Sequence, residues 1–130
     1  MNKFVTDTMG YVLHLEKRKM PETTKTIFQN AENGETEITV PGIVIAEIGY
    51  LSEKKRIDLS LNYVSSHLEK STNFKEQPLN LDIIKTAYQI DDIPELHDRL
   101  IAGTAKYLDQ ELITIDPIIA KSKHLKTIWK

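Results

Sequence analysis

Four acidic residues stand near the expected ends of strands and helices. Asp7 follows the first apolar run of the chain, and Asp116 closes a late strand. Asp98 opens an expected helix, and Glu47 lies inside an amphipathic stretch. The carboxyl ends of parallel strands open on one edge of a sheet, so side chains far apart in the chain can meet there. Carboxylate oxygens suit Mg²⁺ and Mn²⁺, and the pattern therefore predicts a divalent cation site.

A structural role is the alternative for each acid taken singly. Asp7, Asp98 and Asp116 stand where an aspartate could cap a helix by accepting hydrogen bonds from free backbone amides. We expect residues 43–51 to be largely buried, and an ionised Glu47 among them is costly unless it is paired or bound. A salt bridge is its alternative. If the four acids do converge, they repel one another, so at least one should be partly protonated without metal.

The composition is that of an ordinary globular protein. The chain has 130 residues, which we expect to form a single domain over residues 1–130, with 40% hydrophobic and 28% charged residues. The absence of cysteine excludes disulfides and thiolate metal sites. The net charge of −2 gives no bulk attraction for nucleic acid. The first residues resemble neither a signal peptide nor a membrane span, so we expect a cytoplasmic protein without membrane contact.

The elements that must position the acids alternate between strand and helix. Short apolar runs predict strands at residues 3–6, 37–40, 74–78, 112–115 and 127–129. Helices are expected after Asp7, from 21 to about 33, from 58 to about 70, from 80 or 81 to 90, from 97 onward, and briefly after Asp116. This alternation predicts an α/β fold, a three-layer α/β/α sandwich around a mainly parallel sheet of four to five short strands.

Two local patterns give sharper expectations. Small residues crowd positions 102–105, and Gly103 among them lets a helix approach a neighbouring helix or the sheet closely. Asp58 is expected to cap the helix that follows it, with Leu61 and Tyr63 among the inward positions.

The segments VTDT, VIAEIGYL, HDRLIAGTA and LITIDP contain the four acids in order. In order and spacing they resemble the acidic motifs of the PIN-domain family, and most of all its small VapC-type toxins. The resemblance spans nearly the whole chain. It implies a PIN-like fold and a nuclease that depends on Mg²⁺ or Mn²⁺, with Asp7, Glu47, Asp98 and Asp116 as the catalytic and metal-binding residues. Thr114 matches a hydroxyl position that often lies beside such a site.

The resemblance also implies a function and partners. The chain would be an endoribonuclease that hydrolyses RNA phosphodiester bonds as the toxin of a type II toxin–antitoxin pair. Its partners would be an RNA substrate, a small antitoxin whose tail occupies the groove near the acids, and a second copy in a homodimer. The alternative is a catalytically silent PIN-fold module that binds RNA or protein. A phospho-acceptor signalling domain is remote, because Asp7 is followed by Thr8 and not by a second acid.

The basic residues and histidines give weaker indications. Arg99 could steady a carboxylate or meet a phosphate. A structural ion pair is favoured, because adjacent helix residues such as Asp98 and Arg99 point in different directions. The basic runs 17–19 and 54–56 suit helix C-termini, and would contact RNA only if both lie at the mouth of the acidic pocket. No paired metal-ligand spacing is visible among the four histidines, His14, His67, His97 and His124.

Overall fold

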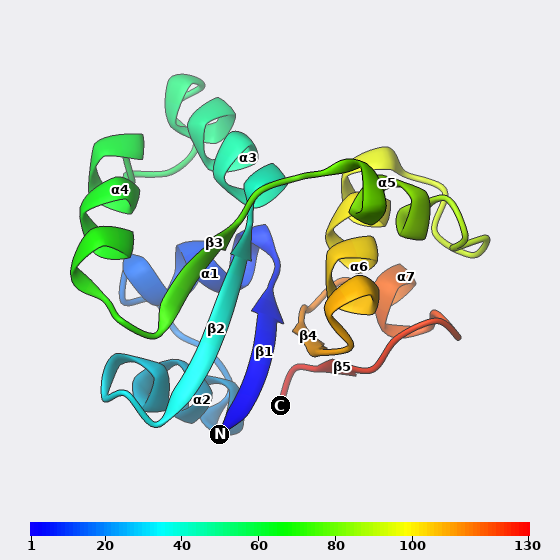
Figure 1. Ribbon diagram of the computed structural model, residues 1–130. Coiled ribbons are helices and arrows are strands. Elements are labelled where there is room, and N and C mark those ends of the chain that lie inside the picture. Colours follow the sequence, from blue (N-terminus) through cyan, green and yellow to red (C-terminus); the bar gives the residue numbers. More distant parts are fainter.

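A five-stranded parallel sheet forms the centre of the computed structural model, which describes residues 1–130 (Figure 1). The strands are β1 (Asn2–Thr6), β2 (Thr36–Pro41), β3 (Phe74–Gln77), β4 (Glu111–Ile113) and β5 (Thr127–Ile128). Their order is β3-β2-β1-β4-β5, and every neighbouring pair is parallel. The predicted α/β fold with a parallel sheet is confirmed.

Seven helices connect the strands. They are α1 (Thr8–Leu15), α2 (Glu22–Glu32), α3 (Gly42–Glu53), α4 (Leu61–Lys70), α5 (Leu81–Ala87), α6 (Leu96–Leu108) and α7 (Pro117–Ala120). Helices α1, α2 and α4 lie on one side of the sheet, and α5, α6 and α7 on the other, as right-handed crossovers in opposite directions require (Figure 1). None of the helices combines the length and hydrophobicity that a membrane crossing needs.

The central strands β1, β2 and β4 carry the sheet part of the core. Val5, Val40 and Leu112 are fully buried, as expected for strands covered on both faces. In the register of β1 with β4, Thr6 pairs with Ile113, and these are the last residues of the two strands. The two strands therefore end level with each other, and the residues that follow them start from the same edge of the sheet.

Gly103 allows α6 to pack tightly against α5. A Cβ atom at Gly103 would lie 2.6 Å from Cβ and 2.8 Å from Cα of Ala87 in α5. Such distances do not fit a methyl group, so the two helix backbones are as close as glycine permits. The predicted close approach at residues 102–105 is confirmed, and the neighbour is a helix.

Gly103→Ala should therefore lower the free energy of unfolding by about 1–3 kcal/mol, because the Ala87 backbone must move to admit the methyl group. Gly49→Ala is the matched control. A Cβ there would meet Cδ1 of Leu61 at 3.1 Å, and this half-exposed side chain can rotate away. The control should be neutral or more stable by up to about 1 kcal/mol, since alanine favours a helix. Urea denaturation compares the two, and equal losses would contradict the prediction.

The start of α4 differs from the prediction. Ser60 caps it by accepting a hydrogen bond from the backbone N–H of Tyr63. Asp58 is not the cap, because the chain at this point is turned toward Glu16, whose Oε2 accepts from the Asp58 backbone N–H at 2.8 Å. Leu61 and Tyr63 were predicted to point inward, but they are 49% and 52% exposed.

Helix α3 is less buried than its apolar sequence predicted. Only Val44 and Ile48 are buried, and Tyr50 is 56% exposed. The reason is its place in the fold: α3 lies beyond the carboxyl end of the sheet and packs against α1, α4 and α6, which cover one side of it (Figure 1). The expectation that residues 43–51 are largely buried is therefore wrong, and apolar side chains of α3 remain open to solvent.

Candidate metal centre

Four carboxylates from four segments line one hollow at the carboxyl edge of the sheet. Asp7 directly follows β1, and Asp116 comes shortly after the end of neighbouring β4. The chain leaves these strands in opposite directions within the sheet, which opens a crevice between their ends. Glu47 reaches it from α3 and Asp98 from the first turn of α6. All four line this acidic hollow, which has a volume of about 530 Å³.

Asp7 and Asp116 are also helix caps. Oδ1 of Asp7 accepts a hydrogen bond from the Gly10 backbone N–H at 2.7 Å at the start of α1. Oδ1 of Asp116 accepts from the backbone N–H groups of Ile118 and Ile119 at 2.8 and 3.2 Å at the start of α7. The capping interpretation is thus correct for both residues. Capping uses only Oδ1 of each carboxylate and holds the carboxylate at the rim of the acidic hollow. Capping and ligand binding are therefore compatible.

Asp98 is not a cap, contrary to the prediction that it opens the helix. Helix α6 begins at Leu96, and its cap is Glu95, whose Oε2 accepts from the Asp98 backbone N–H at 2.7 Å. The Asp98 carboxylate therefore has no part in capping and faces the other acids. The sequence did not single out Glu95, although it lies three residues before Asp98, the spacing of a cap and its donor.

Glu47 is held by residues that the sequence analysis did not place in the site. The Thr8 hydroxyl donates a hydrogen bond to Oε1 of Glu47. Nδ1 of His97 lies 3.4 Å from Oε2 of Glu47 and 3.5 Å from Oε1 of Glu95. The Glu47 side chain is 27% exposed, so it does not carry the burial penalty that its apolar segment suggested. The position of Thr8 beside Asp7 was the one sequence signal for this contact.

The surroundings of Asp7 raise its pKa from 3.8 to about 6. Burial is the largest cause, and the charges of Asp116 and Glu47 add to it. Hydrogen bonds from Thr114 and the Gly10 backbone act in the opposite direction. The Thr114 hydroxyl also accepts from the Asp116 backbone N–H at 3.1 Å, which places this predicted accessory residue between the two aspartates.

The pKa of Asp98 is also raised from 3.8 to about 6. Burial is again the largest cause, followed by the negative charges of Asp116, Glu95, Glu47 and Asp7. Two carboxyls of the cluster are therefore partly protonated near pH 6 when no cation is bound, which agrees with the repulsion expected from the sequence. A cation would remove this repulsion.

The acidic hollow has no basic side chain in its lining. Arg99 does not form the predicted ion pair: its Nε donates to the Ile93 carbonyl at 2.8 Å, and its guanidinium lies over the Tyr88 ring at 5.4 Å. It thus fixes the loop before α6. Residues 17–19 line a different hollow, and residues 54–56 line neither. The condition for RNA contacts by the two basic runs is therefore not met.

The donor atoms of the acidic hollow fit a hard divalent cation. They are carboxylate oxygens supported by the hydroxyls of Thr8 and Thr114, with no thiolate and no imidazole in the lining. Mg²⁺ and Mn²⁺ prefer such oxygen ligands, whereas softer ions favour nitrogen or sulfur.

This chain belongs to the PIN-domain family, whose sequence model matches residues 5–125. The predicted membership of this family is thereby confirmed. No curated protein sequence matches the chain.

Solved structures share its fold at low sequence identity. VapBC2 from Rickettsia felis, bound to a DNA fragment from its promoter, has a TM-score of 0.74 and 17% identity over 98% of this chain and 99% of that chain. A toxin–antitoxin complex from Klebsiella pneumoniae has a TM-score of 0.62 and 18% identity over 90% and 89%. VapC20 from Mycobacterium tuberculosis, a sarcin–ricin loop cleaving toxin, has a TM-score of 0.60 and 11% identity over 95% and 98%.

Proposed function

We propose that this protein is an endoribonuclease that uses Mg²⁺ or Mn²⁺ to hydrolyse RNA phosphodiester bonds, as the toxin of a type II toxin–antitoxin pair. The observation that carries the proposal is the acidic hollow itself, with four carboxylates and no basic side chain in its lining. A phosphate is repelled by such a surface unless a cation lies between them. Phosphate chemistry at this place therefore requires bound metal.

Known relatives support the assignment of substrate and role. The structural neighbour from Klebsiella pneumoniae is a toxin–antitoxin complex, and that from Mycobacterium tuberculosis is a cleaving toxin. The resemblance of the acidic segments to VapC-type toxins implies RNA as the substrate. These similarities and the donor set of the hollow point to the same reaction.

The chain's own residues prepare the site for this chemistry. Asp7, Glu47, Asp98 and Asp116 would hold the metal, which when bound lowers the pKa of a coordinated water and offsets negative charge on the phosphate oxygens. Hydrogen bonds to the α1 and α7 backbones fix Asp7 and Asp116. Thr8 fixes Glu47. Three of the four carboxylates are thus oriented before any ligand arrives, which lowers the entropic cost of binding.

The proposed antitoxin contact has a suitable surface beside the acids. A hollow of about 430 Å³ is lined by apolar side chains of α3, including Ile43, Ala46 and Tyr50, and it shares Glu47 and Leu51 with the acidic hollow. An antitoxin tail with apolar residues and a basic residue would cover both hollows.

We also propose that the protein forms a homodimer in the cytoplasm. Light scattering of the purified protein tests the dimer.

A cleavage assay with matched variants tests the proposed activity. Labelled RNA should be cut with Mg²⁺ or Mn²⁺ and left intact with excess EDTA. Asp98→Asn should reduce cleavage at least about 100-fold, since even supporting residues of metal sites are worth about 10- to 100-fold. Asp82→Asn is the control, because Asp82 also lies in the first turn of its helix but is exposed, away from the hollow.

Three outcomes would overturn the proposal: cleavage that persists in EDTA, an Asp98→Asn variant as active as the parent, or a parent that cuts no RNA. The last result would favour the silent binding module instead.

A further inference from the structure

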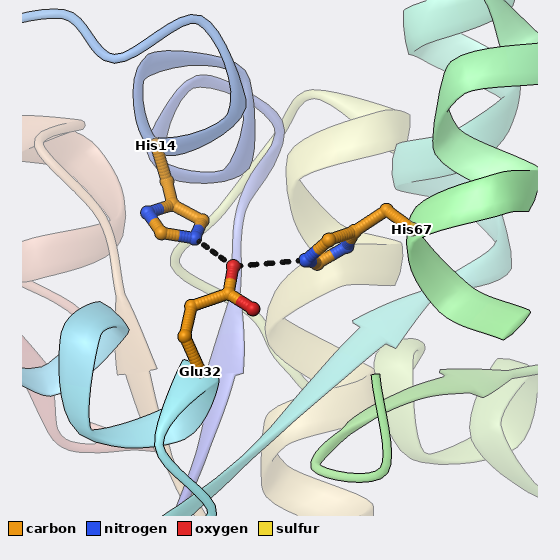
Figure 2. A group of neighbouring side chains, drawn as sticks. All are labelled: His14, Glu32 and His67. Atoms are coloured by element: carbon orange, nitrogen blue, oxygen red, sulfur yellow. Dashed lines mark hydrogen bonds and ion pairs between the residues drawn. The ribbon is translucent and has the colours of Figure 1, made fainter. Parts of the chain in front are cut away.

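Residues that could bind a metal also converge outside the acidic hollow, between α1, α2 and α4. His14 comes from the end of α1, Glu32 ends α2, and His67 belongs to α4 (Figure 2). Nε2 of His14 and Nε2 of His67 lie 2.6 and 2.9 Å from the same Oε2 atom of Glu32. One ligand atom from each residue lies within 4.8 Å of the other two. The sequence showed no such group, because its three members come from three separate helices.

We propose that His14, Glu32 and His67 form a Zn²⁺ site that is separate from the acidic hollow. Zn²⁺ binds imidazole nitrogen and carboxylate oxygen at about 2.0–2.2 Å in a tetrahedron, whose ligand atoms are then about 3.3 Å apart. The observed contacts of 2.6 and 2.9 Å are slightly shorter. The Glu32 side chain is 36% exposed at a helix end, so a small outward movement of it admits the ion.

The fourth coordination position opens to solvent. All three side chains line a hollow of about 810 Å³, which can supply a water ligand. Two imidazoles, one carboxylate and an open position form a ligand set that zinc proteins use. Because imidazole suits Zn²⁺ and not Mg²⁺, this site and the acidic hollow select different ions.

Packing and a hydrogen bond hold the two imidazoles in their orientation. The His14 ring lies parallel to Phe28 and Phe74, with centroids 4.7 and 5.5 Å away. The His67 ring packs edge-on against Phe74 at 4.5 Å. Nδ1 of His67 lies 2.7 Å from the hydroxyl of Tyr11, which is fully buried. Such a partner on the second ring nitrogen is a regular feature of histidines that bind metal.

A second group of possible ligands, Asp91, Asp92 and His124, provides the contrast. Asp92 already accepts hydrogen bonds from the Ser122 hydroxyl and the Lys123 backbone N–H, both at 2.8 Å. The Asp91 side chain is 87% exposed. This group joins two loops, has only one imidazole and serves as the control.

Calorimetric titration of the whole protein with Zn²⁺, in excess Mg²⁺, tests the site. One Zn²⁺ per chain should bind here. Glu32→Gln and His67→Gln should each weaken its affinity at least about 100-fold, and Tyr11→Phe about 10- to 100-fold. His124→Gln should leave the affinity unchanged, as should Asp98→Asn, which alters the acidic hollow. Glu32→Gln keeps an acceptor for both imidazoles, so it should fold, and circular dichroism checks this.

The proposal is wrong if Zn²⁺ fails to bind, if affinity is the same in Glu32→Gln and His67→Gln as in the parent, or if Asp98→Asn or His124→Gln abolishes binding. The readout is binding and not cleavage. A negative result here therefore leaves the proposed nuclease function standing, and a failed cleavage assay leaves this site standing.

Discussion

Asp7→Asn should abolish RNA cleavage and at the same time stabilise the metal-free protein above about pH 6. Asp7 is only 7% exposed and faces the charges of Asp116 and Glu47, so its ionised form is unfavourable without a cation. Asparagine keeps an oxygen to accept from the Gly10 backbone N–H, and its amide can donate to the neighbouring carboxylates. The variant therefore removes a charge that only the proposed function needs. Cleavage should fall at least about 100-fold.

The pH dependence follows from the sign of the pKa shift. The pKa of Asp7 is about 6 in the folded chain and about 3.8 when unfolded. The folded state therefore binds the proton more tightly, and the parent loses stability as pH rises from about 4 through 6. Two pKa units correspond to at most about 3 kcal/mol. The stability gained in Asp7→Asn should approach this value at pH 7.5 and fall to about 0.5 kcal/mol at pH 4, where Asp7 is protonated in the folded chain and partly protonated in the unfolded chain.

Urea denaturation in EDTA at the two pH values measures this difference. Added Mn²⁺ should stabilise the parent by linkage and the variant less. A variant that is less stable than the parent at pH 7.5, or that gains as much at pH 4, would show that Asp7 is held for capping alone.

The positions of Asp7 and Asp116 could be predicted because each depends on local sequence and one topological rule, whereas the family resemblance placed Glu47 and Asp98 beside them. The apolar run before Asp7 and that before Asp116 identify strands, and parallel strands bring their carboxyl ends together. Residues far apart in the chain then meet without any knowledge of side-chain contacts. The small residues around Gly103 predicted helix packing for a similar reason, since steric exclusion acts whatever the partner is.

Contacts that depend on side-chain direction between separate helices could not be predicted. Thr8 meets Glu47 only because the first residue of α1 packs against the middle of α3. His14 and His67 meet only at Glu32, with one helix supplying each residue. Helix boundaries were also uncertain by a few residues, as caps compete locally. At the start of α6 the cap is Glu95, so the Asp98 carboxylate takes no part in capping.

Of the substitutions predicted here, Phe74→Ala should lower the free energy of unfolding most, by about 3–5 kcal/mol. The whole free energy of unfolding of a small domain is about 5–15 kcal/mol. Phe74 is 2% exposed and is the only buried residue of edge strand β3. Its ring packs against Tyr11 at 6.0 Å and Phe28 at 6.3 Å, and against the two imidazoles of the proposed Zn²⁺ site. Removing it leaves a cavity under all of them.

Tyr63→Ala is the matched aromatic control, because Tyr63 is 52% exposed and its loss should change stability by less than about 0.5 kcal/mol. Urea denaturation measures both. Amide exchange then tests the cause: without Phe74, β3 has no buried side chain and depends mainly on its pairing with β2, so its amides should exchange before those of β1 and β4. A loss below about 1.5 kcal/mol with unchanged exchange in β3 would mean that backbone pairing, and not this ring, holds the edge of the sheet.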